Sequence, residues 1–98
     1  HLARFDALTG LPNRLYINET LAGALEQARA WRRRCAFLMI DLDRFKAVND
    51  TLGHPVGDRL LAQVAARLKQ LCNDNVIAGR LGGDEFAVVM REIDGIDS

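Results

Sequence analysis

The chain has 98 residues, of which 49% are apolar and 27% are charged, and its 13 basic and 13 acidic side chains cancel to a formal charge of zero. This length accommodates one small domain but not two, and the composition is typical of a globular fold. The balanced charge gives no indication of a domain that binds nucleic acid by neutralising phosphates. No apolar run approaches the roughly 20 residues that a membrane-spanning helix needs. Cys35 and Cys72 stand in apolar stretches and fit a reducing compartment, so we expect a cytoplasmic protein or the cytoplasmic part of a membrane-anchored one.

The N-terminal third predicts a turn that leads into a long helix. The sequence Leu-Thr-Gly-Leu-Pro-Asn at residues 8–13 is typical of such a turn, with Asn13 as the N-cap and Pro12 preventing the helix from extending backwards. Over residues 14–32, apolar side chains recur at helical spacing while charged side chains take the other faces. These features predict an amphipathic helix.

Residues 35–40 are apolar throughout, which predicts a strand buried on both faces in a sheet that is covered by helices. The polar residues that follow predict a loop as far as Gly57. A second amphipathic helix is predicted over residues 58–71, with Asp58 in its first turn, where a carboxylate complements the positive end of the helix.

Two β-rich runs, at residues 76–81 and 86–90, flank the sequence Gly-Gly-Asp-Glu and predict a β-hairpin. The predicted order is therefore helix, strand, helix, strand, strand. A right-handed crossover would set the buried strand parallel to one strand of the hairpin. This order indicates an α+β or α/β fold.

Acidic residues stand at the ends of the predicted strands. Asp41 and Asp43 share one side of the buried strand if that strand continues, and Asp84 and Glu85 occupy the tip of the hairpin. If the hairpin flanks the strand, three or four carboxylates come together, as they do around a cation, and all-oxygen ligands favour Mg²⁺ or Mn²⁺. Taken separately, Asp-x-Asp is an ordinary solvated strand end and Gly-Gly-Asp is an ordinary turn. The spacing alone leaves both alternatives open.

Glycines beside the acidic tip suggest a binding surface. Gly82 and Gly83 have no Cβ atoms, so a base or a phosphate can approach the backbone closely. The chain has neither a Walker-type loop nor Gly-x-Gly-x-x-Gly, so anion contacts are expected instead from Lys46 and the backbone amides after Asp43.

Polar residues that could read a base follow the buried strand. Asn49 and Asp58 are suited to a purine edge, and a carboxylate that accepts from two adjacent N–H groups fits guanine but not adenine. His54 on its own is more often a turn residue than a ligand.

Four motifs, in order across nearly the whole chain, resemble those of GGDEF domains, the catalytic modules of diguanylate cyclases. The family is named for the sequence found here as Arg-Leu-Gly-Gly-Asp-Glu-Phe at residues 80–86. The family's N-terminal motif corresponds to residues 6–14, and its two nucleotide-binding segments correspond to residues 41–50 and 53–58. The resemblance implies a single GGDEF domain over residues 1–98, with a ferredoxin-like palm sheet similar to that of adenylyl cyclases and with flanking helices.

The resemblance also implies a reaction, in which two GTP molecules are joined into cyclic di-GMP and pyrophosphate with Mg²⁺ (or Mn²⁺). By matching position, the carboxylates of Asp41 and Asp84 and the backbone carbonyl of Leu42 become the metal ligands. Asp84 is also the family's candidate for the general base on the 3′-hydroxyl. Glu85 and Arg80 take supporting roles.

The implied substrate contacts divide into two groups. Asn49 and Asp58 hold the guanine, with His54 nearby. Phe45 and Lys46 contact the triphosphate, and Lys46 also stabilises charge in the transition state.

The resemblance implies partners as well. Each domain holds one GTP, so the reaction needs a homodimer, and a fused sensory domain and a phosphodiesterase domain are both expected neighbours. The main alternative is a non-catalytic GTP-binding regulatory module attached to a cyclic di-GMP phosphodiesterase domain. Many cyclases carry an Arg-x-x-Asp product-inhibition site before the family sequence, whereas residues 73–76 here are Asn-Asp-Asn-Val, so we expect no feedback site of that kind.

The family's domain continues well beyond its hairpin. We therefore expect this chain to be an incomplete domain on its C-terminal side, with an exposed strand edge and with weak activity or none on its own.

Overall fold

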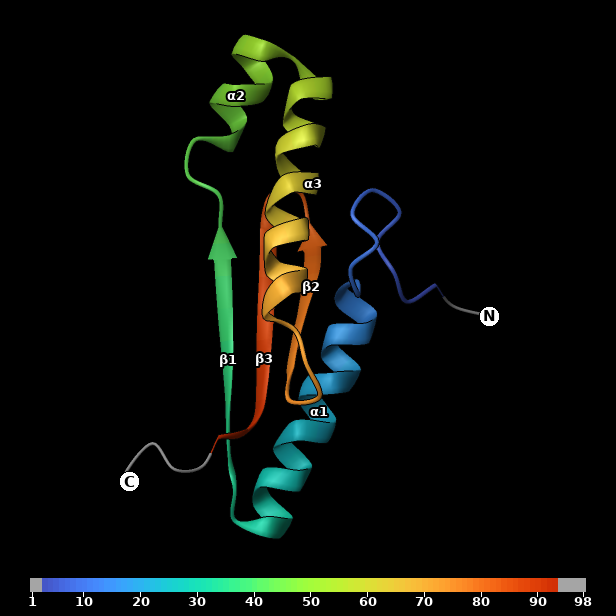
Figure 1. Cartoon of the computed structure of the whole chain (residues 1–98), viewed down its shortest axis with the longest axis vertical. Coiled ribbons are helices and arrows are strands. Elements are labelled where there is room, and N and C mark those ends of the chain that lie inside the picture. The colour runs from blue at the N-terminus through green and yellow to red at the C-terminus, as the bar shows by residue number, and fades with distance from the viewer. Residues whose placement is uncertain (1–2, 94–98) are drawn as a thin grey trace.

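The computed structural model describes residues 3–93 and contains three helices and one three-stranded sheet (Figure 1). In chain order the elements are α1 (Arg14–Trp31), β1 (Arg34–Asp41), α2 (Phe45–Leu52), α3 (His54–Leu71), β2 (Val76–Gly82) and β3 (Glu85–Ile93). This is the α+β fold that the sequence predicts. Within the described residues, no helix combines the length and the apolar character that crossing a membrane requires.

The sheet is antiparallel with the strand order β1-β3-β2. β3 pairs with β1 from Arg34↔Ile93 to Asp41↔Glu85, and on its other side it forms the predicted hairpin with β2. Because β3 runs opposite to both neighbours, β1 and β2 run parallel to each other without touching. The prediction that the strand at residues 35–40 runs parallel to one strand of the hairpin is confirmed, with β3 inserted between the two.

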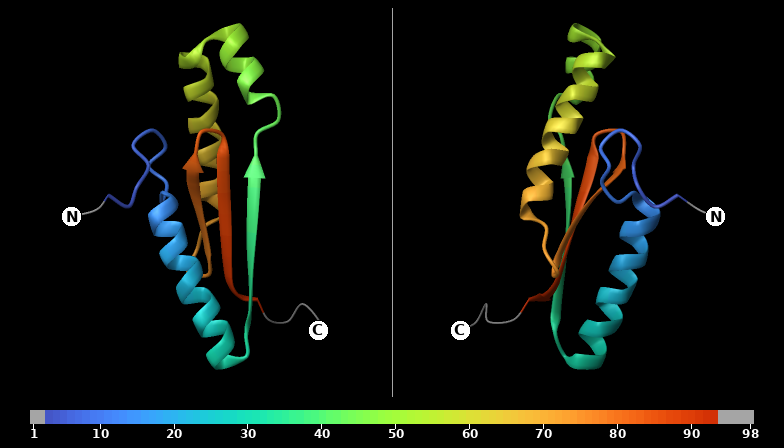
Figure 2. Two further views of the ribbon diagram at one scale, coloured as in Figure 1. Left: turned by 180° about the vertical axis from the view of Figure 1, so that it is seen from behind. Right: turned by 45° about the vertical axis from the view of Figure 1, so that its right-hand side comes forward.

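Two apolar layers cover the central strand, one on each face. Phe86 and Val88 face α3, in a cluster with Leu61 and Ala65 of that helix. The alternate residues of β3, Ala87 and Val89, belong to a second cluster, which Ile17 and Ala24 of α1 complete. The right-hand view of Figure 2 shows α3 and α1 on opposite sides of the sheet. This alternation makes β3 the strand that is buried on both faces.

The prediction of a doubly buried strand at residues 35–40 is wrong. β1 is an edge strand, and Phe37, Leu38 and Met39 are each between 41% and 58% exposed. An uninterrupted apolar run shows that a strand could be buried on both faces. It does not specify which strand occupies the centre of the sheet.

The prediction of a loop up to Gly57 is also wrong, because α2 lies within it and α3 begins at His54. Gly53, at φ 93°, separates the two helices, a backbone conformation that favours glycine. Asp58 therefore falls in the second turn of α3 and not in the first. Phe45, Val48 and Leu52 of α2 do recur at helical spacing, but the helix has only eight residues, and Gly53 and Pro55 just beyond it favoured the prediction of a loop.

The first helix agrees with prediction. It spans Arg14–Trp31, and its N-cap Asn13 accepts a hydrogen bond from the backbone amide of Tyr16 at 3.1 Å. The cap satisfies one of the free N–H groups of the first turn.

Candidate functional site

The end of β1 meets the tip of the hairpin, which we define as residues 82–85. Asp41 pairs in register with Glu85, and the amide of Leu42 donates to the carbonyl of Asp84 at 3.3 Å. The predicted approach of the strand end to the hairpin tip is confirmed. It brings Asp41, Leu42 and Asp84 next to one another.

The hairpin tip is built from two glycines with positive φ, 146° at Gly82 and 49° at Gly83. Nothing lies within 4 Å of the position that a Cβ atom would occupy at either residue. The tip is therefore open on its outer side, and a substrate can approach its backbone closely.

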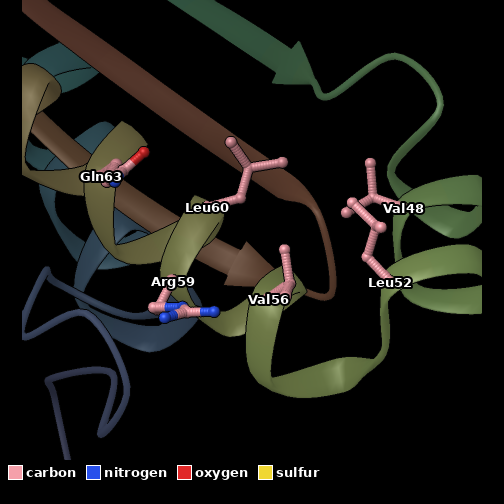
Figure 3. A pocket seen from close by; sticks show the side chains of 6 residues that line it. All are labelled: Val48, Leu52, Val56, Arg59, Leu60 and Gln63. Carbon is pink, nitrogen blue, oxygen red and sulfur yellow. The ribbon is translucent and has the colours of Figure 1, made fainter.

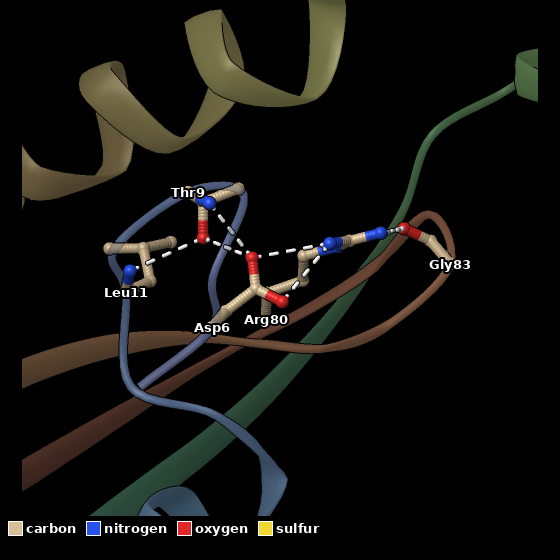
Figure 4. A network of polar contacts seen from close by, with 5 residues as sticks. All are labelled: Asp6, Thr9, Leu11, Arg80 and Gly83. Carbon is tan, nitrogen blue, oxygen red and sulfur yellow. Dashed lines mark hydrogen bonds and ion pairs between the residues drawn. The ribbon is translucent and has the colours of Figure 1, made fainter. Parts of the chain in front are cut away.

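Arg80 holds the tip from β2. Its Nε and Nη2 atoms donate to the carbonyl of Gly83 at 3.0 and 2.8 Å. Its Nη1 atom contacts both carboxylate oxygens of Asp6, at 3.1 and 3.2 Å (Figure 4). One guanidinium thus joins the N-terminal turn to the hairpin tip.

Asp6 is held in place by its own turn. Its Oδ2 atom accepts from the amide and the hydroxyl of Thr9 at 2.9 and 2.8 Å, and the Thr9 hydroxyl oxygen accepts from the amide of Leu11. Burial acts to raise the pKa of Asp6, but the two Thr9 hydrogen bonds and the Arg80 guanidinium outweigh it, and the net pKa lies below its ordinary value.

Gly57 of α3 lies directly against the side chain of Asn49 on α2. The Oδ1 atom of Asn49 is buried and has no hydrogen-bond partner among the described residues. A Cβ atom on Gly57 would lie only 1.8 Å from that oxygen and 3.4 Å from Cζ of Phe45. The absence of a side chain at Gly57 therefore determines where the Asn49 amide sits.

The remaining predicted residues lie on exposed surfaces around this end of the sheet. Lys46, His54 and Asp58 are exposed on the N-terminal parts of α2 and α3, which stand beyond the end of β1 (Figure 1). Asp43 is also exposed, but β1 ends at Asp41, so the strand does not align these two aspartates as expected.

The predicted cluster of three or four carboxylates is not formed. Among residues 3–93, no group of three or more His, Cys, Asp and Glu side chains is placed to hold a metal ion. Glu85 is instead 3.8 Å from Arg14, in an exposed ion pair. The junction then offers the carboxylates of Asp41 and Asp84 and the backbone carbonyl of Leu42. All of these are oxygen ligands, the type that Mg²⁺ and Mn²⁺ prefer.

A pocket of about 430 Å³ opens between α2 and α3 (Figure 3). Its lining residues are mostly apolar: Val48, Leu52, Val56, Arg59, Leu60 and Gln63. None of them is a predicted site residue, so this pocket is separate from the acidic junction.

The fold and the junction define an α+β domain with an oxygen-rich site where an edge strand meets a glycine-rich hairpin tip. The family described as "Diguanylate cyclase, GGDEF domain" matches residues 3–97. The chain belongs to this GGDEF family.

Individual relatives agree. Diguanylate cyclase TpbB of Pseudomonas aeruginosa is 46% identical over 93 residues, which are 95% of this chain and 21% of that protein. Cyclic di-GMP phosphodiesterase NbdA of the same organism is 43% identical over 88 residues, 90% of this chain and 11% of that protein. The solved structure of TpbB that comprises only the GGDEF domain superposes with a TM-score of 0.87 at 44% identity, covering 95% of this chain and 55% of that chain. The chain thus spans about a fifth or less of these relatives and about half of the solved domain.

Sequence reasoning missed the roles of Asp6, Thr9 and Gly57. Asp6 and Thr9 stand three residues apart in the N-terminal motif. This spacing is typical of an aspartate that accepts hydrogen bonds within its own turn, so the contact between them could have been predicted. No pattern in the sequence links Asp6 to Arg80, because 74 residues separate them.

Proposed function

We propose that this chain is the substrate-binding part of a diguanylate cyclase domain, which condenses two GTP molecules into cyclic di-GMP and two pyrophosphates. The observation that carries the proposal is the junction of Asp41 and Leu42 with Asp84, where the amide of Leu42 donates to the carbonyl of Asp84 at 3.3 Å. The similarity to diguanylate cyclase TpbB supports the same reaction.

In this reaction each 3′-hydroxyl attacks the α-phosphorus of the other GTP. A P–O bond forms, the bond to the β-phosphate oxygen breaks, and pyrophosphate leaves with the electron pair. Asp84 accepts the proton of the hydroxyl as general base. Lys46, exposed at the start of α2, stabilises the negative charge on the phosphates, and Phe45 lies beside it.

The metal site is assigned to Asp41, the carbonyl of Leu42, and Asp84. When bound, Mg²⁺ supplies Lewis-acid stabilisation of phosphate charge and orients the phosphates. Asn49 and Asp58 bind the guanine with His54 nearby, which makes GTP the substrate in preference to ATP. Gly82 and Gly83 leave the hairpin tip open to the nucleotide.

Each domain contributes one GTP, so two domains must face each other as a homodimer. Sensory and phosphodiesterase domains are the proposed neighbours in the longer protein, and a cytoplasmic location follows from the use of GTP.

A second function is favoured by one specific observation. NbdA, which is 43% identical to this chain, is named as a cyclic di-GMP phosphodiesterase. In that alternative, the domain binds GTP to regulate an attached phosphodiesterase domain and makes no product.

The deciding experiment measures magnesium-dependent conversion of GTP to cyclic di-GMP by the full-length protein, beside an Asp84→Ala variant and a sample treated with EDTA. Product that disappears in the variant and after chelation supports the cyclase. GTP binding without product supports the regulatory module.

A further inference from the structure

We propose that Asp6, Thr9 and Arg80 form a strut that positions the backbone of Asp84 at the hairpin tip. The strut is a positioning device and does not touch the nucleotide. Its significance for metal binding and catalysis rests on the proposed function.

Both peptide groups that flank Asp84 are held from outside the hairpin tip. The carbonyl of Gly83, on the N-terminal side, accepts two hydrogen bonds from Arg80 at 2.8 and 3.0 Å. The carbonyl of Asp84 itself accepts from the amide of Leu42 at 3.3 Å. With both flanking peptides held, the direction in which the Asp84 side chain leaves the backbone is set.

The tip has little other support. Gly82 and Gly83 have the widest backbone freedom of any residue type, and no atom lies within 4 Å of where their Cβ atoms would be. Side-chain packing therefore cannot immobilise this turn. The two donors of Arg80 are the side-chain hydrogen bonds that hold the glycine part of the tip, at the Gly83 carbonyl.

Arg80 is itself held by the N-terminal turn. The side chains of Arg80 and Asp6 are only 14% and 19% exposed, and the contact joins one guanidinium nitrogen to both carboxylate oxygens. The backbone amide of Arg80 also donates to the carbonyl of Pro12 at 2.9 Å. The rotamer of Arg80 is thus fixed by residues that lie at the beginning of the chain.

Asp6 in turn is fixed by short-range hydrogen bonds. Thr9 gives it two donors, and its backbone bonds to Leu11 and Gly10 close the turn at 2.7 and 2.8 Å. The chain of contacts runs from the N-terminal turn through Arg80 to the Gly83 carbonyl and ends at Asp84.

The molecule contains a matched control. Arg4 and Glu19 form an equally short pair, with two nitrogen–oxygen contacts of 3.0 Å, but their side chains are 47% and 48% exposed and do not contact the hairpin tip. Replacing Arg4 removes a similar pair of hydrogen bonds without affecting the strut.

The test compares full-length protein carrying Arg80→Met, Asp6→Asn, both changes, or the control Arg4→Met. The first measurement is the affinity for Mn²⁺ in the presence of GTP, from the electron paramagnetic resonance signal of free Mn²⁺, which requires no turnover. The second is kcat and KM for cyclic di-GMP formation. Melting temperatures confirm that each variant is folded at the assay temperature, and Arg80→Lys, which keeps the charge but not the fork of donors, serves if Arg80→Met does not fold.

We expect Arg80→Met to weaken Mn²⁺ binding about tenfold, as losses behind metal ligands generally do, and to lower kcat with KM within about threefold of wild type. Asp6→Asn shows a smaller loss in the same direction. The double variant is no worse than Arg80→Met, because both changes act on one chain of contacts. Arg4→Met matches wild type.

Folded Arg80 and Asp6 variants that bind Mn²⁺ within twofold of wild type would overturn the strut, and so would an equal loss in Arg4→Met. If the wild type binds Mn²⁺ with GTP but makes no product, the proposed cyclase activity is contradicted. The Mn²⁺ affinities of the variants still test the positioning role of the strut. A wild type that makes product while all variants bind Mn²⁺ alike contradicts the strut alone.

Discussion

Gly57 and Asn49 show how one missing side chain can make room for a residue that we propose binds guanine. Any Cβ atom at Gly57 would lie 1.8 Å from Oδ1 of Asn49, so Gly57→Ala must displace the Asn49 side chain or separate α2 from α3. Overpacking of this kind destabilises by roughly 1–3 kcal/mol. We expect Gly57→Ala to weaken GTP binding by at least tenfold and to lower the melting temperature modestly, as titration calorimetry and thermal unfolding would measure.

Gly23 provides the matched control for this prediction. It is an exposed helical glycine of α1, and a Cβ atom there has nothing within 4 Å. Gly23→Ala should leave GTP binding unchanged and stabilise the helix by up to about 1 kcal/mol. Equal GTP affinity in Gly57→Ala and Gly23→Ala would show that Gly57 does not position Asn49.

Asp6 makes the stability of the domain sensitive to acid. Its pKa in the folded state lies below the ordinary value of 3.8, so the stability that it contributes is fully present above that value and is lost as the pH falls through the folded-state pKa. Asp6→Asn lacks this titration. We expect the variant to be less stable than wild type at pH 7, and the difference to shrink as the pH falls below about 4.

The measurement is the free energy of unfolding in urea for both proteins between pH 7 and pH 3. A difference between wild type and Asp6→Asn that stays constant over this range would contradict the role of ionised Asp6.

The helices and strands could be predicted to different degrees. Asn13 and the helical period located α1 closely, and the glycine-rich turn between two β-rich runs located the hairpin. The place of each strand in the sheet could not be predicted, because burial of β3 depends on which elements pack on it. Both β1 and β3 are apolar, and only the strand order distinguishes the edge from the centre.

The exposed apolar edge strand predicts self-association of the 98-residue chain. Phe37, Leu38 and Met39 of β1 are substantially exposed, and the outer edge of this strand has no paired neighbour among the described residues. An exposed strand edge can form backbone hydrogen bonds with a strand of another chain. A lysine at the edge opposes this association. We expect Met39→Lys to shift the isolated chain toward monomer in analytical ultracentrifugation.

Leu25→Lys is the appropriate control, because Leu25 is 51% exposed but lies on the helix α1, whose backbone groups are paired within the helix and do not form a strand edge. If both lysine substitutions reduce association equally, general apolar exposure and not the β1 edge is responsible.

At the scale of the whole molecule, the sequence correctly predicted that two strand ends meet, but it did not predict the order of the strands in the sheet. The adjacency of Asp41 and Asp84 follows from two strands that end together, and the structure contains it. The contact between Asp6 and Arg80 could not be predicted, because no local pattern links two residues that lie 74 positions apart in the sequence. The radius of gyration, 15.1 Å, exceeds the value of about 13 Å for a compact domain of this length.

This extended shape affects the activity that we expect of the isolated chain. The chain covers 55% of the solved GGDEF domain of TpbB, so nearly half of such a domain has no counterpart here. We expect the isolated 98-residue chain to make no detectable cyclic di-GMP under conditions in which the full-length protein does, because among the described residues β1, which ends at Asp41, is paired on one edge only. The measurement is product formation at equal molar concentration, with the Asp84→Ala variant of the longer protein as the background. Turnover by the isolated chain at a rate close to that of the full-length protein would show that residues 1–98 suffice for catalysis and that the remainder of the domain only stabilises it.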